Sequence, residues 1–261
     1  MMRLSRFIGV AFAVASLAAA QDSGLRTVHV FVALADNQHQ GIVPVPAKLG
    51  NGDDAEHNLY WGGAGGVKTF FARSGDWQRV TCELKPALEI LERCVFKHRT
   101  ANVYLVADAY RGIEIRKAID DFLDAAAGDR PETMAVQGTS GQVKLPIHGN
   151  ANLVAYVGHD GLMDFQLDRL PQKKHEAHRD AVILACASKQ FFAEPLRSSG
   201  ANPLLWTTGL MAPEAYTLKS ALDGWIAGES SEQIRDRAAG AYDKYQKCGF
   251  RAARRLLVSG W

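Results

Sequence analysis

The hydrophobic pattern of the chain alternates between short apolar runs and longer segments with helical spacing. Near-continuous apolar runs occupy residues 27–35, 101–107, 152–158, 181–185 and 203–208. Short runs rich in Val, Leu and Ile predict strands that are buried on both faces, as in a parallel sheet. Helices are predicted over residues 55–72, 84–97, 112–127, 213–227 and 231–247. Strands that alternate with helices predict an α/β fold, with a mainly parallel sheet flanked by helices on both faces.

The amino-terminal residues have a different pattern. Residues 1–20 carry two arginines and no acidic residue, an apolar run over residues 7–17 and three consecutive alanines at the end. This order predicts a secretory signal peptide, which is too short to span a membrane, and no later segment is long and apolar enough to do so. We therefore expect residues 21–261 to form a single exported α/β domain, periplasmic or extracellular, without stable membrane insertion.

Charge is balanced once the predicted signal peptide is removed. The chain has 30 Lys and Arg, and the loss of Arg3 and Arg6 leaves 28, against 28 Asp and Glu. A net charge near zero argues against a nucleic-acid partner and against an anionic membrane surface. The sequence leaves the oligomeric state open.

The chain has four cysteines, Cys82, Cys94, Cys186 and Cys248, whose spacing does not match a zinc site. Export would permit disulfide formation. If Cys186 stays reduced for chemistry, at most one pair forms among the other three cysteines. The sequence does not select that pair.

A polar or reactive residue follows each predicted strand at its carboxyl end. These residues are Asp36, Asp108, His159, Cys186 and Thr207. Ligands of such sheets bind beyond the carboxyl ends of the strands, so we expect these side chains at one edge. His159 and Cys186 follow two strands that we expect to be neighbours, about 5 Å apart. An imidazole within hydrogen-bond reach can deprotonate a thiol and later protonate the leaving group, so the pattern predicts a Cys-His pair.

The residues around this pair resemble the caspase, legumain and gingipain group of cysteine peptidases. LVAYVGHDG and AVILACAS resemble the strands that carry the group's histidine and cysteine. VHVFVALAD, GDDAEHNLYW and VYLVADAYRGIEIRKAIDDFL resemble its first strand, its first helix, and its second strand with the helix that follows. The resemblance implies a caspase-like three-layer sandwich. It also implies a cysteine-type peptidase or related acyl-transfer hydrolase, acting on a peptide or protein substrate with no cofactor and no metal.

The resemblance also implies a role for each site residue. His159 would be the general acid/base, Cys186 would be the nucleophile, and backbone amides at Asp160, Gly161 and Cys186 would form the oxyanion hole. In this group a glycine usually follows the histidine directly, whereas here Asp160 intervenes. A carboxylate at that place would oppose a developing oxyanion. The alternative is therefore a catalytically inactive caspase-fold binding module that uses the same strand-end cleft.

A substrate pocket is expected at the same edge. The resemblance implies that the residue two before the cysteine, here Leu184, lines this pocket. Acidic residues near the strand ends would select a basic substrate side chain, and the end of the fifth strand would wall the pocket. The pocket residues expected are Asp36, Asp108, Leu184, Trp206 and Thr207, with Asp160 as a further acidic group.

Three other motifs have simpler explanations. His148-Gly149 precedes the third strand, about 25 Å from the edge of interest, and is interpreted as a turn. His175 and His178 have helical spacing but not the zinc-peptidase pattern, so we expect solvated side chains, and a metal-binding function is only a third hypothesis. The segment GGAGGVKT lacks the glycine that precedes the lysine in a phosphate loop.

Overall fold

The computed structural model describes residues 24–138, 141–174, 176 and 178–261, and the predicted signal peptide lies outside them. Five strands are parallel: β1 (Arg26–Ala33), β4 (Val103–Tyr110), β7 (Leu153–Val157), β8 (Asp180–Leu184) and β9 (Asn202–Thr207). Three antiparallel strands lie at the edges: β2 (Trp77–Leu84), β3 (Ile90–His98) and β10 (Leu257–Val258). The order across this 8-stranded sheet is β10-β9-β8-β7-β1-β4-β3-β2, so the predicted α/β class with a mainly parallel sheet is confirmed.

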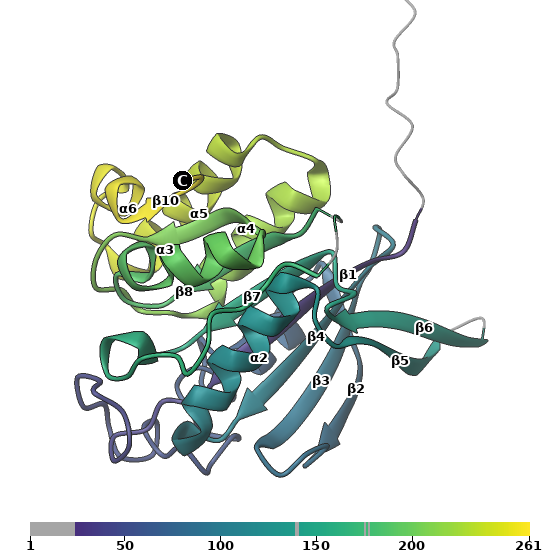
Figure 1. Cartoon of the computed structure of the whole chain (residues 1–261), viewed down its shortest axis with the longest axis horizontal. Coiled ribbons are helices and arrows are strands. Elements are labelled where there is room, and N and C mark those ends of the chain that lie inside the picture. Colours follow the sequence, from purple (N-terminus) through teal and green to yellow (C-terminus); the bar gives the residue numbers. More distant parts are fainter. Residues whose placement is uncertain (1–23, 139–140, 175, 177) are drawn as a thin grey trace, which may run out of the picture.

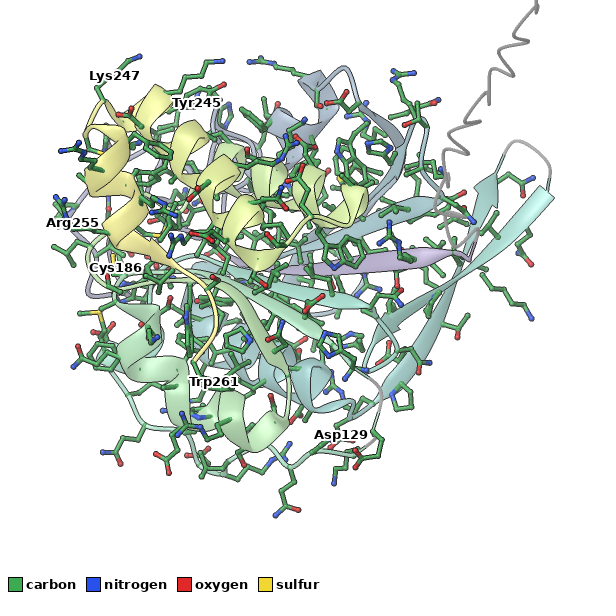
Figure 2. The ribbon with its side chains drawn as sticks, turned by 90° about the horizontal axis from the view of Figure 1, so that it is seen from above. Asp129, Cys186, Tyr245, Lys247, Arg255 and Trp261 are labelled. Carbon is green, nitrogen blue, oxygen red and sulfur yellow. A yellow bond between two sulfur atoms is a disulfide. The ribbon has the colours of Figure 1, made fainter. Side chains whose placement is uncertain are left out.

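Helices cover both faces of this sheet (Figures 1 and 2). The first face is covered by α1 (Val67–Arg73), α4 (Ala215–Ala227), α5 (Ser231–Gln246) and α6 (Phe250–Leu256). The opposite face is covered by α2 (Ile115–Ala127) and α3 (Ser188–Ser199). None of the helices in the described part of the chain combines the length and apolarity needed to cross a bilayer.

The central strand β1 shows why its sequence is almost continuously apolar. Val28, Val30 and Val32 are buried in the core beneath α1 and α4, whereas Phe31 and Ala33 are buried beneath α2 and α3. Successive side chains of a strand point to opposite faces, so a strand covered on both sides needs apolar residues at both its odd and its even positions.

The helix predicted over residues 84–97 is wrong. This region forms the hairpin of β2 and β3, and a disulfide joins Cys82 to Cys94 across the two strands. One inward-facing position of β3 is occupied by Glu92, which is only 5% exposed. The sequence of this strand therefore does not show the alternation of apolar and polar residues that identifies a strand. Burial of this carboxylate is compensated by Lys68 Nζ at 2.7 Å and Trp61 Nε1 at 2.7 Å.

The helix predicted over residues 55–72 is reduced to α1, because turns occupy the residues before it. The turn at Gly62 is too tight for a side chain, since a Cβ atom there would lie 1.9 Å from Glu56 O. The glycines of this segment therefore serve tight turns and close packing. The interpretation as a phosphate loop stays rejected.

A second hairpin, β5 (Pro131–Gly138) with β6 (Gly141–His148), was not expected and projects from the sheet in Figure 1. It packs on β3 and β4 through apolar contacts that include Val95, Val106 and Leu145. His148 is the last residue of β6 and is 4% exposed, and the turn expected at His148-Gly149 begins there, with Ala151 N donating to His148 O at 2.9 Å.

Candidate active site

The predicted Cys-His pair lies at the carboxyl ends of two adjacent parallel strands. Strands β7 and β8 pair in register up to Val157 and Leu184, and each chain then turns out of the sheet. Gly158 N donates to Leu184 O at 3.2 Å, which brings the residues after the two strands together. Gly158 has a φ of +153°, and a Cβ atom there would lie 2.9 Å from Ala33 O, so a side chain is strained at this position. In Figure 2, Cys186 lies at the end of the sheet opposite the β5–β6 hairpin.

His159 and Cys186 line the same cavity, which has a volume of about 280 Å³. Its other walls come from loops at this edge of the sheet and are mostly apolar. The lining residues besides the pair are Gly41, Ile42, Val43, Val45, Leu59, Tyr60, Gly158, Met163, Leu210, Met211, Ala212, Pro213 and Glu214. The structure therefore brings the two predicted catalytic residues to one apolar cleft.

The imidazole of His159 is held in a defined orientation. Its Nε2 lies 2.7 Å from Asp164 Oδ2, and its side chain is 6% exposed. The hydroxyl of Tyr156 donates to His159 O at 2.7 Å and so fixes the backbone. With Nε2–H donating to the carboxylate, Nδ1 carries the lone pair. Nδ1 makes no hydrogen bond within the described part of the chain, so it is available to accept a proton.

The thiol of Cys186 rests against the backbone of Met211. Met211 N donates to Sγ at 3.4 Å, and Sγ lies 3.6 Å from Met211 O. Burial raises the pKa of the Cys186 thiol, the bond to Met211 opposes this, and the charge of Asp160 raises the pKa further. Among the described residues, no hydrogen bond joins Sγ to His159. The resting thiol is thus protonated at neutral pH, and transfer of its proton to His159 requires Cys186 to release Met211.

Asp160 lies immediately after His159 and is fully buried. Its Oδ1 accepts a hydrogen bond from Leu162 N at 3.0 Å, whereas Oδ2 has no hydrogen-bond partner within the described chain. Burial raises the pKa of the Asp160 carboxyl to about 7, and the charge of Asp164 raises it as well. Part of the Asp160 population is therefore uncharged at neutral pH, which weakens its opposition to an oxyanion.

The predicted oxyanion hole has two remaining candidate donors. Gly161 begins a short 3₁₀ turn, η2 (Gly161–Met163), and its N–H donates to His159 O at 3.1 Å. This N–H is therefore engaged in the turn. The N–H groups of Asp160 and Cys186 are the expected donors that are left.

Asp108 is inside β4 rather than at its end, because β4 continues to Tyr110. Arg93 donates to both carboxylate oxygens, at 2.6 and 2.7 Å, and His29 Nε2 lies 3.1 Å from Oδ2. Asp108 has no accessible surface and does not line the cavity. Its position argues against the predicted role in selecting a basic substrate.

The other residues expected in the pocket also lie outside the cavity lining. Asp36 closes a turn after β1, with Oδ2 2.8 Å from His39 Nδ1. Leu184 and Trp206 are fully buried in the two cores. Thr207 is buried behind Cys186: its N–H donates to Ser188 Oγ at 2.9 Å, and its hydroxyl donates to Ala185 O. Thr207 therefore supports the turn that carries the cysteine.

Two polar residues of the cavity were missed because they lie in loops. Glu214 forms no ion pair within the described residues, and burial raises the pKa of its carboxyl. Tyr60 is 7% exposed, and its pKa is raised by burial and by the charges of Cys186 and Glu214, so these three groups lie together. The sequence carried no signal for these two residues. It carried one weak signal for the cavity wall, which is the apolar pair Ile42 and Val43 within a segment rich in Gly and Pro.

The side-chain clusters with metal-binding residue types do not fit a metal ion. In the first cluster, His29 Nε2 is engaged by Asp108, and its Nδ1 accepts from His148 N at 3.1 Å. The guanidinium of Arg93 on the same carboxylate would repel a cation. The second cluster contains Cys82 and Cys94, which are already joined in a disulfide.

The third hypothesis, a metal held by His175 and His178, gains no support. His175 lies outside the described residues, whereas His178 is 74% exposed and has Nε2 3.1 Å from Asp180 Oδ1.

A scan against protein-family models, a search of curated proteins and a search of solved structures each found no match to this chain.

Proposed function

We propose that the protein is an exported caspase-fold cysteine peptidase, or a related acyl-transfer hydrolase. Cys186 is the nucleophile and His159 is the general acid/base. The observation that carries the proposal is that both side chains line one cavity at the carboxyl ends of adjacent parallel strands. The central strand order β4-β1-β7-β8, with the histidine after β7 and the cysteine after β8, supports the caspase-like arrangement.

The proposed reaction begins when His159 Nδ1 takes the thiol proton of Cys186. Sγ then attacks the carbonyl carbon of the substrate, and the N–H groups of Asp160 and Cys186 bind the resulting oxyanion. The amine leaves as the C–N bond breaks, and it takes the proton held by His159. Water then attacks the thioester, with His159 again accepting and returning the proton, which releases the acid and restores the thiol.

The cavity favours an apolar substrate side chain. Its walls include Ile42, Val43, Leu59, Met163 and Leu210, and burial of apolar surface is the main favourable contribution such walls offer. The sequence predicted that Asp36 and Asp108 would bind a basic substrate side chain. Neither residue lines the cavity, because Asp36 contacts His39 and Asp108 contacts Arg93 and His29. We therefore expect peptides with an aliphatic or aromatic residue before the scissile bond.

Export is part of the proposal. It rests on the predicted signal peptide of residues 1–20, and the disulfide between Cys82 and Cys94 supports it. Disulfides persist in oxidising compartments and are rare in reducing ones.

The alternative function is a non-catalytic binding module that uses the same cleft. The observation that favours it is the resting state of Cys186, whose thiol is bonded to Met211 and whose pKa is raised by burial. A cleft of this kind would hold a peptide without cleaving it.

The test is covalent labelling with acyloxymethyl-ketone peptides that carry an apolar residue next to the ketone, measured by intact mass. We expect a single adduct on the wild type and none on Cys186→Ala. His159→Ala should slow labelling about 100-fold, which is the low end for loss of a general base. Cys248→Ala is the matched control, since it removes the other free thiol, which is exposed, and should label like the wild type. Absence of labelling, or equal rates for His159→Ala and the wild type, would favour the binding module.

A further inference from the structure

Asp164 is the partner of His159 on the side of the ring away from the free Nδ1. Its Oδ2 lies 2.7 Å from His159 Nε2, which is the short distance typical of a hydrogen bond to a charged acceptor. The side chain of Asp164 is 42% exposed, whereas that of His159 is 6% exposed. The carboxylate is thus hydrated on one side and bonded to the buried imidazole on the other.

The contact between His159 and Asp164 is built by one turn of the chain. Asp160 Oδ1 caps η2, and Asp164 N donates to Gly161 O at 2.9 Å at the end of the turn. The ring of Phe165 packs beneath Gly161, where a Cβ atom would come within 2.7 Å of it. The geometry is therefore held by backbone and packing rather than by the ion pair alone.

The same carboxylate oxygen also reaches the rim of the cavity. Gly41 N donates to Asp164 Oδ2 at 3.2 Å, and Gly41 begins the segment that supplies Ile42, Val43 and Val45 to the cavity wall. A Cβ atom on Gly41 would lie 2.7 Å from Asp164 Oδ1, so the rim backbone approaches the carboxylate as closely as a glycine allows. One oxygen thus joins the histidine to the substrate-side loop.

We propose that Asp164 is a positioning residue that orients His159 and stabilises its protonated form, so that the working unit is Cys186, His159 and Asp164. The resemblance to the caspase group implied only the histidine and the cysteine. This inference rests on the proposed function. The carboxylate fixes the proton on Nε2, which leaves Nδ1 to serve the thiol, and it compensates the charge that the imidazole gains when the thiol ionises.

The test is the rate of Cys186 alkylation by iodoacetamide between pH 5 and pH 9, with Cys186→Ala as the background. A small reagent is used because it does not depend on the cavity rim. Asp164→Asn keeps the shape but removes the charge that stabilises the imidazolium. We therefore expect the acid limb of the rate profile, where His159 must lose its proton to act as a base, to move down by about one pH unit. The rate at pH 7 should fall about tenfold, the loss expected for a partly exposed bond to a charged group.

Two further variants make the result specific. Asp164→Glu should recover most of the rate, because it restores a carboxylate near Nε2. Asp168→Asn is the matched control, since this carboxylate is 91% exposed and lies 3.7 Å from Arg116, and it should follow the wild-type profile.

Other groups near the thiol also titrate or carry charge, namely Asp160, Tyr60, Tyr242 and Glu214. Asp164 itself raises the pKa of Asp160, so removal of its charge would leave Asp160 more ionised. The Asp164→Asn comparison is therefore repeated in an Asp160→Asn background. The downward shift should persist there if Asp164 acts through His159.

The outcomes separate the two proposals. If His159→Ala slows alkylation but Asp164→Asn keeps the wild-type profile, the role of Asp164 is overturned and the proposed function stands. The role of Asp164 is likewise overturned if the shift disappears in the Asp160→Asn background. If His159→Ala matches the wild type at every pH, the catalytic pair itself fails. A role confined to the cavity rim would slow peptidyl-ketone labelling and leave the iodoacetamide profile unchanged, which also overturns the inference.

Discussion

Replacement of Asp160 by Asn should make the stability of the protein less sensitive to pH. Asp160 is fully buried, one carboxylate oxygen has no partner in the described chain, and burial raises its pKa from 3.8 to about 7. An acid whose pKa is raised by folding opposes folding once it ionises in the unfolded chain. The penalty is absent below about pH 4, grows as the pH rises, and is complete above about pH 7.

The size of the effect follows from the two pKa values of Asp160. Each pH unit between them corresponds to about 1.4 kcal/mol, so the full penalty is about 4 kcal/mol. About 3 kcal/mol of it develops between pH 5 and pH 9. Asparagine keeps the acceptor for Leu162 N and places an uncharged amide where the unpaired oxygen was. Any constant effect of that amide cancels when the two pH values are compared.

The assay is urea unfolding of the wild type and Asp160→Asn at pH 5 and pH 9. We expect the free energy of unfolding of the variant, relative to the wild type, to rise by about 3 kcal/mol between the two conditions. Asp168→Asn, a carboxylate that is 91% exposed, is the control and should show no such change. A constant difference between variant and wild type at both pH values would refute the reasoning, because Asp160 would then be ionised without penalty.

Two further stability predictions concern residues outside the cavity. Asp108→Asn leaves the guanidinium of Arg93, which is only 15% exposed, without its carboxylate. The free energy of unfolding should therefore fall by about 3 kcal/mol at pH 7 in urea titrations, and a loss under about 1 kcal/mol would contradict a stabilising pair with the buried Asp108. The double change Cys82→Ser and Cys94→Ser opens a loop with a sequence separation of 12, which should lower the free energy of unfolding by about 3 kcal/mol. Reduction of the wild type by dithiothreitol should reproduce that loss in a thermal scan, and an unchanged melting temperature would argue against the disulfide.

The sequence was informative where one physical requirement dominated. Strands β1, β7 and β8 are buried on both faces, so their residues are mainly apolar at odd and even positions alike. The ends of these strands were therefore easy to predict. His159 and Cys186 could be paired because parallel strands deliver their carboxyl ends to one edge. That part of the site needed only strand order and strand ends.

The rest of the site depended on contacts that the sequence does not display. Glu92 occupies an inward position of β3 because Lys68 and Trp61 compensate its charge, so the pattern of this strand resembled that of a helix. Asp108 was expected to follow a strand because the apolar run ends at Ala107, yet Arg93 and His29 hold it inside β4.

The cavity walls come from loops whose positions depend on tertiary contacts. Tyr60, Met163 and Glu214 are far apart in sequence and meet only at the strand ends. Hydrophobic periodicity does not predict contacts between residues of different loops, because a loop has no repeating geometry.

The central claim is that Cys186 cleaves peptides, and it is tested most directly by digestion of a defined peptide library. The purified wild type and Cys186→Ala would be incubated with the library near pH 7, and new termini would be identified by mass spectrometry. We expect cleavage by the wild type alone, with aliphatic or aromatic residues enriched before the cut, because the cavity beside Cys186 is lined mainly by apolar side chains. A library left intact by the wild type, or cut equally by Cys186→Ala, would contradict the claim.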